Sequence, residues 1–279
     1  IPLRLVGSEM CIRDRHPDVL LSSVKDCPSR IIGRAFYFVF SSIMMAPLTN
    51  EVLQQLAREF GTPLYVYHAE KISDQYQQLR NAFQQGPVRL FYAAKALTNQ
   101  QVLRHIRDLG CDVDCSSINE VHLALRAGFS PDRILYTSNS IDFSELEAAQ
   151  QAGVHLNIDS LSNLEKFGRK FSSSYPVGIR LRPNILAGGN LKISTGHSSS
   201  KFGVPLEQLD AVQDIVRQTG LVIHALHIHT GSEIKEVAVF FQGVELLLGL
   251  LPQFPAVQVI DLGGGFKVPY APGETGTDI

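Results

Sequence analysis

The chain has 279 residues, of which 44% are hydrophobic, and its formal net charge is -2. A chain of this size can bury one large core or two ordinary ones, and its charge gives no electrostatic reason to expect a nucleic-acid partner. Neither a CxxC pair nor a histidine cluster at zinc-ligand spacing accompanies the four cysteines, Cys11, Cys27, Cys111 and Cys115. We therefore predict a soluble globular protein of a reducing, cytoplasmic compartment, without a metal site.

The first 44 residues do not match the pattern of the rest. The stretch "VGSEMCIRDR" is typical of translated sequencing adaptor, whereas Met45 followed by "APLTNEVLQQLAREFGTPLYVY" reads like a natural start. The apolar stretch "AFYFVFSSIMMAP" is far shorter than the roughly 20 residues of a spanning helix, so no membrane partner is expected. We treat residues 1–44 as a non-native leader and residues 45–279 as the domain.

From Met45 onward the chain repeats one unit, a short β-rich run followed by an amphipathic helix that ends at glycine. The predicted helices include 99–109, 142–152 and 206–219, with Asn99 and Asp142 as N-caps. The predicted strands are 88–93, 111–113, 134–137, 155–158, 177–181, 223–229 and 257–261. A run of such βα units predicts a parallel sheet.

Several strands recur at about the minimal βα period, which favours a (β/α)8 barrel of the TIM type over an open doubly wound sheet. The sequence contains seven of the eight strands that a closed barrel needs. We therefore expect a barrel that is apparently truncated before its eighth strand, which would follow Ile279. The segment "TPLYVYHAEKI" predicts one further strand outside the barrel.

Side chains capable of chemistry follow the predicted strands at their carboxyl ends, where barrel enzymes build their active sites. They are Lys95, Ser116, Ser117, Ser138, Asn139, Arg180, Arg182, His229 and the glycines Gly263–Gly265.

Lys95 ends the apolar run "FYAAKAL". A lysine at a strand end can simply extend its ammonium group into solvent. Alternatively, a desolvated amine loses its proton more readily and can form a Schiff base with an aldehyde. The residue alone leaves both interpretations open.

Two further motifs combine glycine with polar side chains. "DLGGGF" offers three consecutive backbone N–H groups at Gly263, Gly264 and Gly265, which suits a phosphate but is also compatible with a plain turn. "HIHTGS" places His227 and His229 on one strand face before Ser232. Each histidine could be a core residue, but the pair before a Gly-Ser turn favours a ring-stacking imidazole and a phosphate-binding hydroxyl.

The segment between the fifth and sixth strands is too long for a simple βα connection. It contains the glycine-rich loop "NILAGGNLKISTGH" and then "SSSKFGV". Such a loop can be a linker or the wall of an active site, and its basic residues Lys192 and Lys201 could equally form a solvated face.

Together these motifs resemble one family, the fold-type III pyridoxal-phosphate decarboxylases built on an alanine-racemase-like barrel. "YAAKAL", "SKFG", "HTGS" and "DLGGGF" are similar to its lysine, barrel-loop, stacking-histidine and phosphate-loop motifs, in the family's order. The similarity runs from about Leu48 to about Ile279. Within the family, "DCSSINEVHLALRAGF" and the Gly-Gly-Asn loop most resemble the diaminopimelate decarboxylase branch.

The resemblance implies pyridoxal 5'-phosphate as cofactor and decarboxylation of meso-diaminopimelate to L-lysine, a small amino-acid substrate. Lys95 would hold the cofactor covalently, and His229 would stack on its ring. Ser232 and Gly263–Gly265 would bind its phosphate. Charge-orienting or supporting roles would fall, less specifically, to Arg180, Arg182, Asp114, Ser116 and Glu120.

The sequence departs from the family in containing no Glu-Pro-Gly-Arg motif, whose acid pairs with the ring nitrogen. The family's C-terminal β-domain is also expected to be missing, so the fragment itself should be inactive, while the full-length protein should be a homodimer. Open alternatives are an ornithine-, arginine- or carboxynorspermidine-type decarboxylase, a non-catalytic pyridoxal-phosphate-binding barrel, and a sugar-phosphate barrel enzyme that uses Lys95 for a carbonyl Schiff base.

Overall fold

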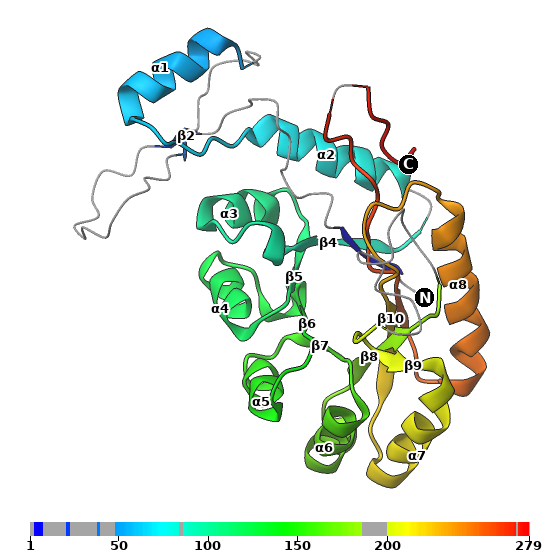
Figure 1. The fold of residues 1–279 in the computed structure, drawn as a ribbon. Coiled ribbons are helices and arrows are strands. Elements are labelled where there is room, and N and C mark those ends of the chain that lie inside the picture. The colour runs from blue at the N-terminus through cyan, green and yellow to red at the C-terminus, as the bar shows by residue number, and fades with distance from the viewer. Residues whose placement is uncertain are drawn as a thin grey trace.

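The computed structural model describes residues 3–7, 21–22, 38–39, 48–83, 86–185, 200–271 and 273–278 (Figure 1). The α-helices are α1 Asn50–Phe60, α2 Ala69–Ala82, α3 Gln100–Asp108, α4 Ile118–Arg126, α5 Phe143–Gln151, α6 Leu161–Phe171, α7 Leu209–Thr219 and α8 Ala238–Leu250. The strands are β1 Leu3–Gly7, β2 Leu21–Ser22, β3 Phe38–Val39, β4 Val88–Ala93, β5 Asp112–Cys115, β6 Ile134–Thr137, β7 His155–Ile158, β8 Val177–Arg182, β9 Val204–Pro205, β10 Ile223–Ile228 and β11 Val259–Asp261.

One parallel sheet forms a ring. Its strand order is β10-β11-β1-β4-β5-β6-β7-β8-β9, and a further pairing of β10 with β8 closes the circle. Helices α3 to α8 follow one another around the outside of this ring, α2 lies between α3 and α8, and α1 lies beyond α2 (Figure 1). The fold is an α/β barrel of the TIM type, as the sequence predicts.

The seven predicted strands are β4, β5, β6, β7, β8, β10 and β11. The place that the sequence analysis left open, between β11 and β4, is occupied by β1. This strand pairs in parallel with β4 over Leu3–Gly7 and with β11 at Leu3 and Arg4 (Figure 1). β1 belongs to the segment that the sequence analysis assigned to the leader, so the barrel of predicted strands stays one strand short of eight.

The helices begin and end where local chemistry predicts. The side chain of Asn99 accepts hydrogen bonds from the first turn of α3, and Gly220 ends α7 in the left-handed conformation at φ 70°. Asp142 occupies the N-cap position of α5, although its side chain makes no capping hydrogen bond. The predicted helix 206–219 is a 3-10 turn, Leu206–Gln208, followed by α7.

The side chains of the strands alternate between two environments, the layer under the helices and the barrel interior. Alternate residues such as Tyr92, Val113 and Tyr136 belong to the apolar cluster between sheet and helices. The residues between them face the barrel interior, and these become polar towards the carboxyl ends of the strands. The interior near this end, called the mouth below, is lined by Asp114, Thr137, Asn157, Arg180, His227 and Asp261.

At the opposite end of the barrel, a buried carboxylate forms ion pairs with two arginines. Asp112 accepts hydrogen bonds from Arg89 Nε at 2.7 Å and from Arg133 Nε at 2.8 Å. These arginines also donate to main-chain carbonyls of Asp132, Arg107 and Cys111. Such an arrangement supports the fold rather than chemistry, because every charge has a partner.

One predicted element is wrong. "TPLYVYHAEKI" is not a strand, since only Tyr65 forms a bridge and the chain enters α2 at Ala69. Pro63 has no N–H to give to a ladder, and the His68 side chain caps α2 by accepting from Lys71 N–H. The helix-capping signal therefore prevails over the β-rich composition of "LYVY".

Some predictions fall outside the described residues, including most of the loop "NILAGGNLKISTGH" with Lys192, and most of "AFYFVFSSIMMAP". Among the helices within the described ranges, none is long and apolar enough to span a bilayer.

Candidate active site

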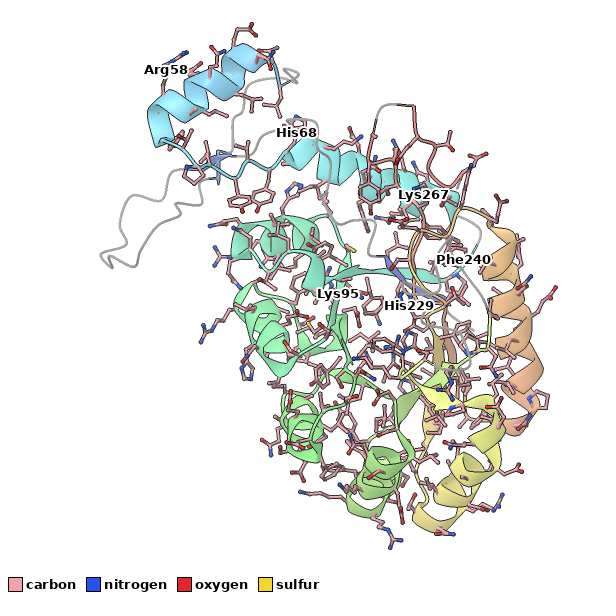
Figure 2. The ribbon with its side chains drawn as sticks, viewed as in Figure 1. Arg58, His68, Lys95, His229, Phe240 and Lys267 are labelled. Carbon is pink, nitrogen blue, oxygen red and sulfur yellow. The ribbon has the colours of Figure 1, made fainter. Side chains whose placement is uncertain are left out.

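Lys95 lies at the mouth, on the 3-10 turn Ala94–Ala96 that directly follows β4 (Figure 2). Its side chain is exposed, whereas the four residues before it, Phe91 to Ala94, are all buried. The ammonium group therefore reaches out of the core at the strand end. Desolvation, which the sequence analysis proposed as the means of activating the amine, is not what this position provides.

His229 follows β10, and Figure 2 shows it near Lys95 at the centre of the ring. His229 is partly exposed, yet desolvation by burial, together with the positive charges of Arg180 and Lys95, lowers the pKa of its imidazole well below the usual value. The Gly264 N–H donates to Nδ1 at 3.4 Å. His229 is thus a neutral imidazole with its proton on Nε2.

His227 lies one inward position deeper in the barrel and is only 3% exposed. Its Nε2 is 4.0 Å from Oδ1 of the buried Asp261. Of the two histidines in "HIHTGS", His229 is therefore the one at the mouth.

The glycine loop Gly263–Gly265 packs against the turn that contains His229. A Cβ atom at Gly263 would lie 2.6 Å from His229 Nδ1, and one at Gly265 would lie 2.0 Å from the Gly231 carbonyl oxygen. Both glycines have positive φ, at 66° and 111°. Only glycine allows these two segments to approach so closely.

Two of the three N–H groups in this loop already have acceptors within the chain. Gly263 N–H donates to Asp261 Oδ1 at 2.9 Å, and Gly264 N–H donates to His229. The loop is therefore built around Asp261 and His229, and it offers fewer N–H groups to a phosphate than the sequence suggests. Ser232 lies in the facing turn and is partly exposed.

The two turns are also joined after the glycines. Ile234 N–H donates to the Gly265 carbonyl at 2.7 Å, and Lys267 N–H donates to the Ile234 carbonyl at 3.1 Å. This short parallel bridge pairs Ile234 with Phe266. It holds Ser232 and the glycine loop on the same side of the mouth.

A buried polar layer lies beneath these groups. Asn157 Nδ2 donates to Thr137 Oγ1 and to Asp261 Oδ2, each at 3.2 Å. Asp261 has no exposed surface, and Asn157 is 1% exposed. This chain of hydrogen bonds links β6, β7 and β11 and fixes the start of the glycine loop.

Arg180 is the buried cation of this layer. Burial lowers its pKa, and the nearby negative charges of Asp159, Asp114 and Asp261 act in the opposite direction. Its guanidinium lies 4.8 Å from the centre of the Phe202 ring. Arg180 thus lies among three carboxyl groups, and its charge-orienting role stays a prediction.

The "SKFG" motif packs against β8. Besides placing Phe202 against Arg180, it brings Gly203 so close to the strand that a Cβ would lie 2.9 Å from the Leu181 carbonyl carbon. Arg182 Nη1 donates to the Ser200 carbonyl. Within the described residues, the buried Arg182 Nε has no partner.

Asp114, Ser116 and Glu120 separate into two groups. Ser116 is exposed, and both its N–H and its hydroxyl donate to Glu120 Oε2, at 2.7 and 3.0 Å. Ser117 caps α4 by accepting from Glu120 N–H. Glu120 thus serves the start of a helix, whereas Asp114 lies inside the barrel.

Sequence reasoning missed Asn157 and Asp159 and assigned no role to Asp261. Asp159 accepts a hydrogen bond from Asn139 Nδ2 and faces Arg180. The only signal for these residues was a polar side chain at an inward position of an otherwise apolar strand. Within the described part of the chain, no His, Cys, Asp or Glu side chains are grouped so that they could hold a metal ion.

The architecture and its site define a barrel that binds a pyridoxal cofactor. Residues 69–279 match the family model "Pyridoxal-dependent decarboxylase, pyridoxal binding domain", so the chain belongs to this family. It is 37% identical to a diaminopimelate decarboxylase of Methanothermobacter thermautotrophicus over 81% of this chain and 54% of that protein. It is 34% identical to the diaminopimelate decarboxylase of Escherichia coli K12, over 83% of this chain and 54% of that protein.

Solved structures agree with this assignment. Diaminopimelate decarboxylase from Helicobacter pylori, in complex with L-lysine, superposes with a TM-score of 0.73 at 26% identity. That comparison covers 81% of this chain and 59% of the other. A viral arginine decarboxylase from Paramecium bursaria Chlorella virus, at 20% identity and a TM-score of 0.70, shares the fold. The chain spans about half the length of the curated relatives it matches.

Proposed function

We propose that this chain is the pyridoxal-phosphate-binding barrel of a diaminopimelate decarboxylase. The observation that carries the proposal is the convergence of Lys95, His229 and the Gly263–Gly265 loop at one mouth (Figure 2). An exposed amine suits an aldehyde, and a neutral imidazole suits a flat aromatic ring. A crowded glycine turn beside Ser232 suits a phosphate. The residues present therefore fit the group that the family binds.

In this proposal, Lys95 holds the cofactor covalently, His229 lies on its ring, and Ser232 with the glycine loop binds its phosphate. When bound, pyridoxal phosphate supplies an electron sink for the bond that is broken at the substrate's α-carbon. The chain's own contribution is to hold that group rigidly. Asp261 and Asn157 fix the glycine loop from below, and Arg180 sets the charge of the layer beneath the site.

The proposed reaction is decarboxylation of meso-diaminopimelate to L-lysine. Relatives named diaminopimelate decarboxylase support this choice at 28 to 37% identity. The L-lysine bound to the Helicobacter pylori protein supports it as well. We further propose a cytoplasmic homodimer. The buried cysteines Cys111 and Cys115 are compatible with a reducing compartment.

The first test is cofactor attachment. The chain is mixed with pyridoxal 5'-phosphate, reduced with borohydride and digested, and the pyridoxyl group is located by mass spectrometry. We expect the label on Lys95 and its loss in Lys95→Ala. Labelling on Lys71 or Lys201 instead would overturn the assignment.

The second test is substrate choice. Carbon dioxide release from meso-diaminopimelate, ornithine and arginine is compared, with the Escherichia coli relative as a positive control. Any turnover by this chain should be selective for meso-diaminopimelate. Selectivity for ornithine or arginine would instead favour the other decarboxylase types.

A further inference from the structure

Because Lys95 is exposed, burial does not remove the proton of its ammonium group. A lysine amine ordinarily carries a proton at neutral pH and becomes a nucleophile only after losing it. Burial can drive that loss, but the Lys95 side chain is exposed. A neighbouring base can accept the proton instead and so make the amine available sooner.

Asp114 is placed to do this. It lies on β5, next to β4, and its Cα pairs in register with that of Ala93, two residues before Lys95. Val113 and Cys115 belong to the apolar cluster beneath the helices, so Asp114 faces the barrel interior. The charge of Lys95 acts directly on its carboxyl group.

One oxygen of the Asp114 carboxyl group is available to accept a proton. The residue is 7% exposed, and the Thr137 side chain hydrogen-bonds to its carboxyl group. Its Oδ1 is buried and has no hydrogen-bond partner within the described residues. Burial of a carboxylate oxygen without a hydrogen-bond donor costs free energy unless the oxygen binds a proton or a cation.

The surrounding charges affect the pKa of the Asp114 carboxyl group. Lys95 faces it from the end of β4 and Arg180 from β8, while Asp261 faces it from β11 and Glu120 from α4. Burial is the largest influence and raises the pKa of Asp114 to about 7. The negative charges of Asp261 and Glu120 add to this rise, whereas Thr137 and Lys95 oppose it. A base of this strength can both accept and return a proton near neutral pH.

We propose that Asp114 is the base that accepts the Lys95 proton and so prepares its amine to capture the cofactor's aldehyde. This inference rests on the proposed function. The N–H bond of the Lys95 ammonium breaks, and an O–H bond forms at Asp114. The amine's electron pair then bonds to the aldehyde carbon. Asp114 returns its proton to the former aldehyde oxygen, and a second proton moves to this oxygen from the nitrogen. The oxygen then leaves as water, and a protonated C=N bond to Lys95 remains.

The test measures how fast Lys95 reacts, independently of decarboxylation. The full chain, without cofactor, is mixed with pyridoxal 5'-phosphate between pH 5 and pH 10. The rate is divided by that of free Nα-acetyllysine, which removes the titration of the reagent itself. Borohydride reduction and mass spectrometry confirm that the signal belongs to Lys95.

With wild-type protein, we expect the normalised rate to rise as pH increases through about 7, where Asp114 ionises. Asp114→Asn should lose this rise and react about tenfold or more slowly at pH 7.5, while reaching the same final labelling. Added acetate should accelerate the Asn variant and leave the wild type unchanged, a rescue that a purely structural role would not give.

The control is Asp142→Asn, which removes an exposed carboxyl that follows β6 and makes no capping hydrogen bond. Its rate should follow the wild-type pH profile. If Asp114→Asn does not fold, Asp114→Glu keeps a carboxyl at the position and must preserve the rise near neutral pH.

The inference is overturned if Asp114→Asn reacts like the wild type, or if Asp142→Asn loses the rise equally. Both outcomes leave the proposed function standing, because Lys95 would still be labelled. Absence of label on Lys95 in the wild type would instead reject the proposed function and the inference with it.

Discussion

At the scale of single residues, the site depends on which of two similar side chains faces the mouth. His229 and His227 are separated by one residue at the end of β10, and His229 contacts the glycine loop. His227 is buried beside Asp261. Position along the chain therefore separates the histidine at the mouth from the histidine packed below it.

This division predicts different effects for the two alanine variants. His229→Ala should weaken retention of pyridoxal 5'-phosphate by about tenfold or more, with a small effect on the melting temperature, because it removes ring contact at a partly exposed position. His227→Ala should lower the melting temperature and leave cofactor affinity near wild type, because it opens a cavity in the barrel. Equilibrium dialysis and thermal unfolding measure the two effects. The reverse pattern would assign the cofactor-facing role to His227.

Asp114 predicts a stability effect that depends on pH. Its pKa is about 7 in the folded chain, against a usual value of 3.8, so the folded state binds more protons than the unfolded state between pH 4 and pH 7. Stability contributed by this group is present below about pH 4 and is lost as pH rises through about 7. Asp114→Asn should therefore be more stable than wild type at pH 8.

The gain at pH 8 should reach up to about 4 kcal/mol, from about 3 pKa units at about 1.4 kcal/mol each. It should largely vanish at pH 4. Urea unfolding of both proteins at pH 4, 6 and 8 measures it. A constant difference across this range would show that Asp114 is ionised in the folded chain at ordinary pKa.

At the scale of elements, the sequence predicted well what depends on local patterns. The bounds of β4, β6 and β7 follow from short apolar runs that end at polar or turn residues. The polar layer could not be predicted in this way. Asn157 and Asp261 are 104 residues apart, and their hydrogen bond depends on the stagger between strands around the ring. Alternation places each side chain inside or outside, but only the register decides which inner residues meet.

The contact between the glycine loop and the His229 turn gives a prediction at this scale. Gly265→Ala places a Cβ 2.0 Å from the Gly231 carbonyl oxygen, which is backbone and cannot rotate away. We expect a loss of more than about 3 kcal/mol in unfolding free energy, or separation of the two turns with loss of cofactor binding.

Gly273→Ala is the matched control, since Gly273 also has a positive φ of 87° but no atom within 4 Å of its added Cβ. It should cost only the backbone strain, about 1 kcal/mol. Urea unfolding and cofactor titration compare the two variants. Equal losses would mean that crowding between the turns is unimportant.

At the scale of the whole molecule, barrel closure depends on β1. Without it, β4 and β11 would each present an unpaired edge next to an interior that is apolar below its polar layer. The sequence analysis set residues 1–44 aside because "VGSEMCIRDR" is typical of translated sequencing adaptor and because Met45 onward reads like a natural start. Pairing of backbone groups is less demanding than side-chain pattern, which is why a short β-prone segment can occupy a place that periodicity did not assign to it.

This role of β1 can be tested at its centre, where Leu5 pairs with Leu90. Leu5→Pro removes an N–H from the ladder and fixes φ, so it should lower the melting temperature by roughly 5 °C or more. Leu5→Val keeps the backbone hydrogen bonds and favours a strand, so it should melt close to wild type.

Deleting residues 1–44 should reproduce the proline effect and add concentration-dependent association, measured by size-exclusion chromatography, because two strand edges become available to other chains. If the proline, valine and deletion variants all melt like the wild type and stay monodisperse, β1 contributes nothing to closure. Residues 1–44 would then be the dispensable leader that their sequence indicates.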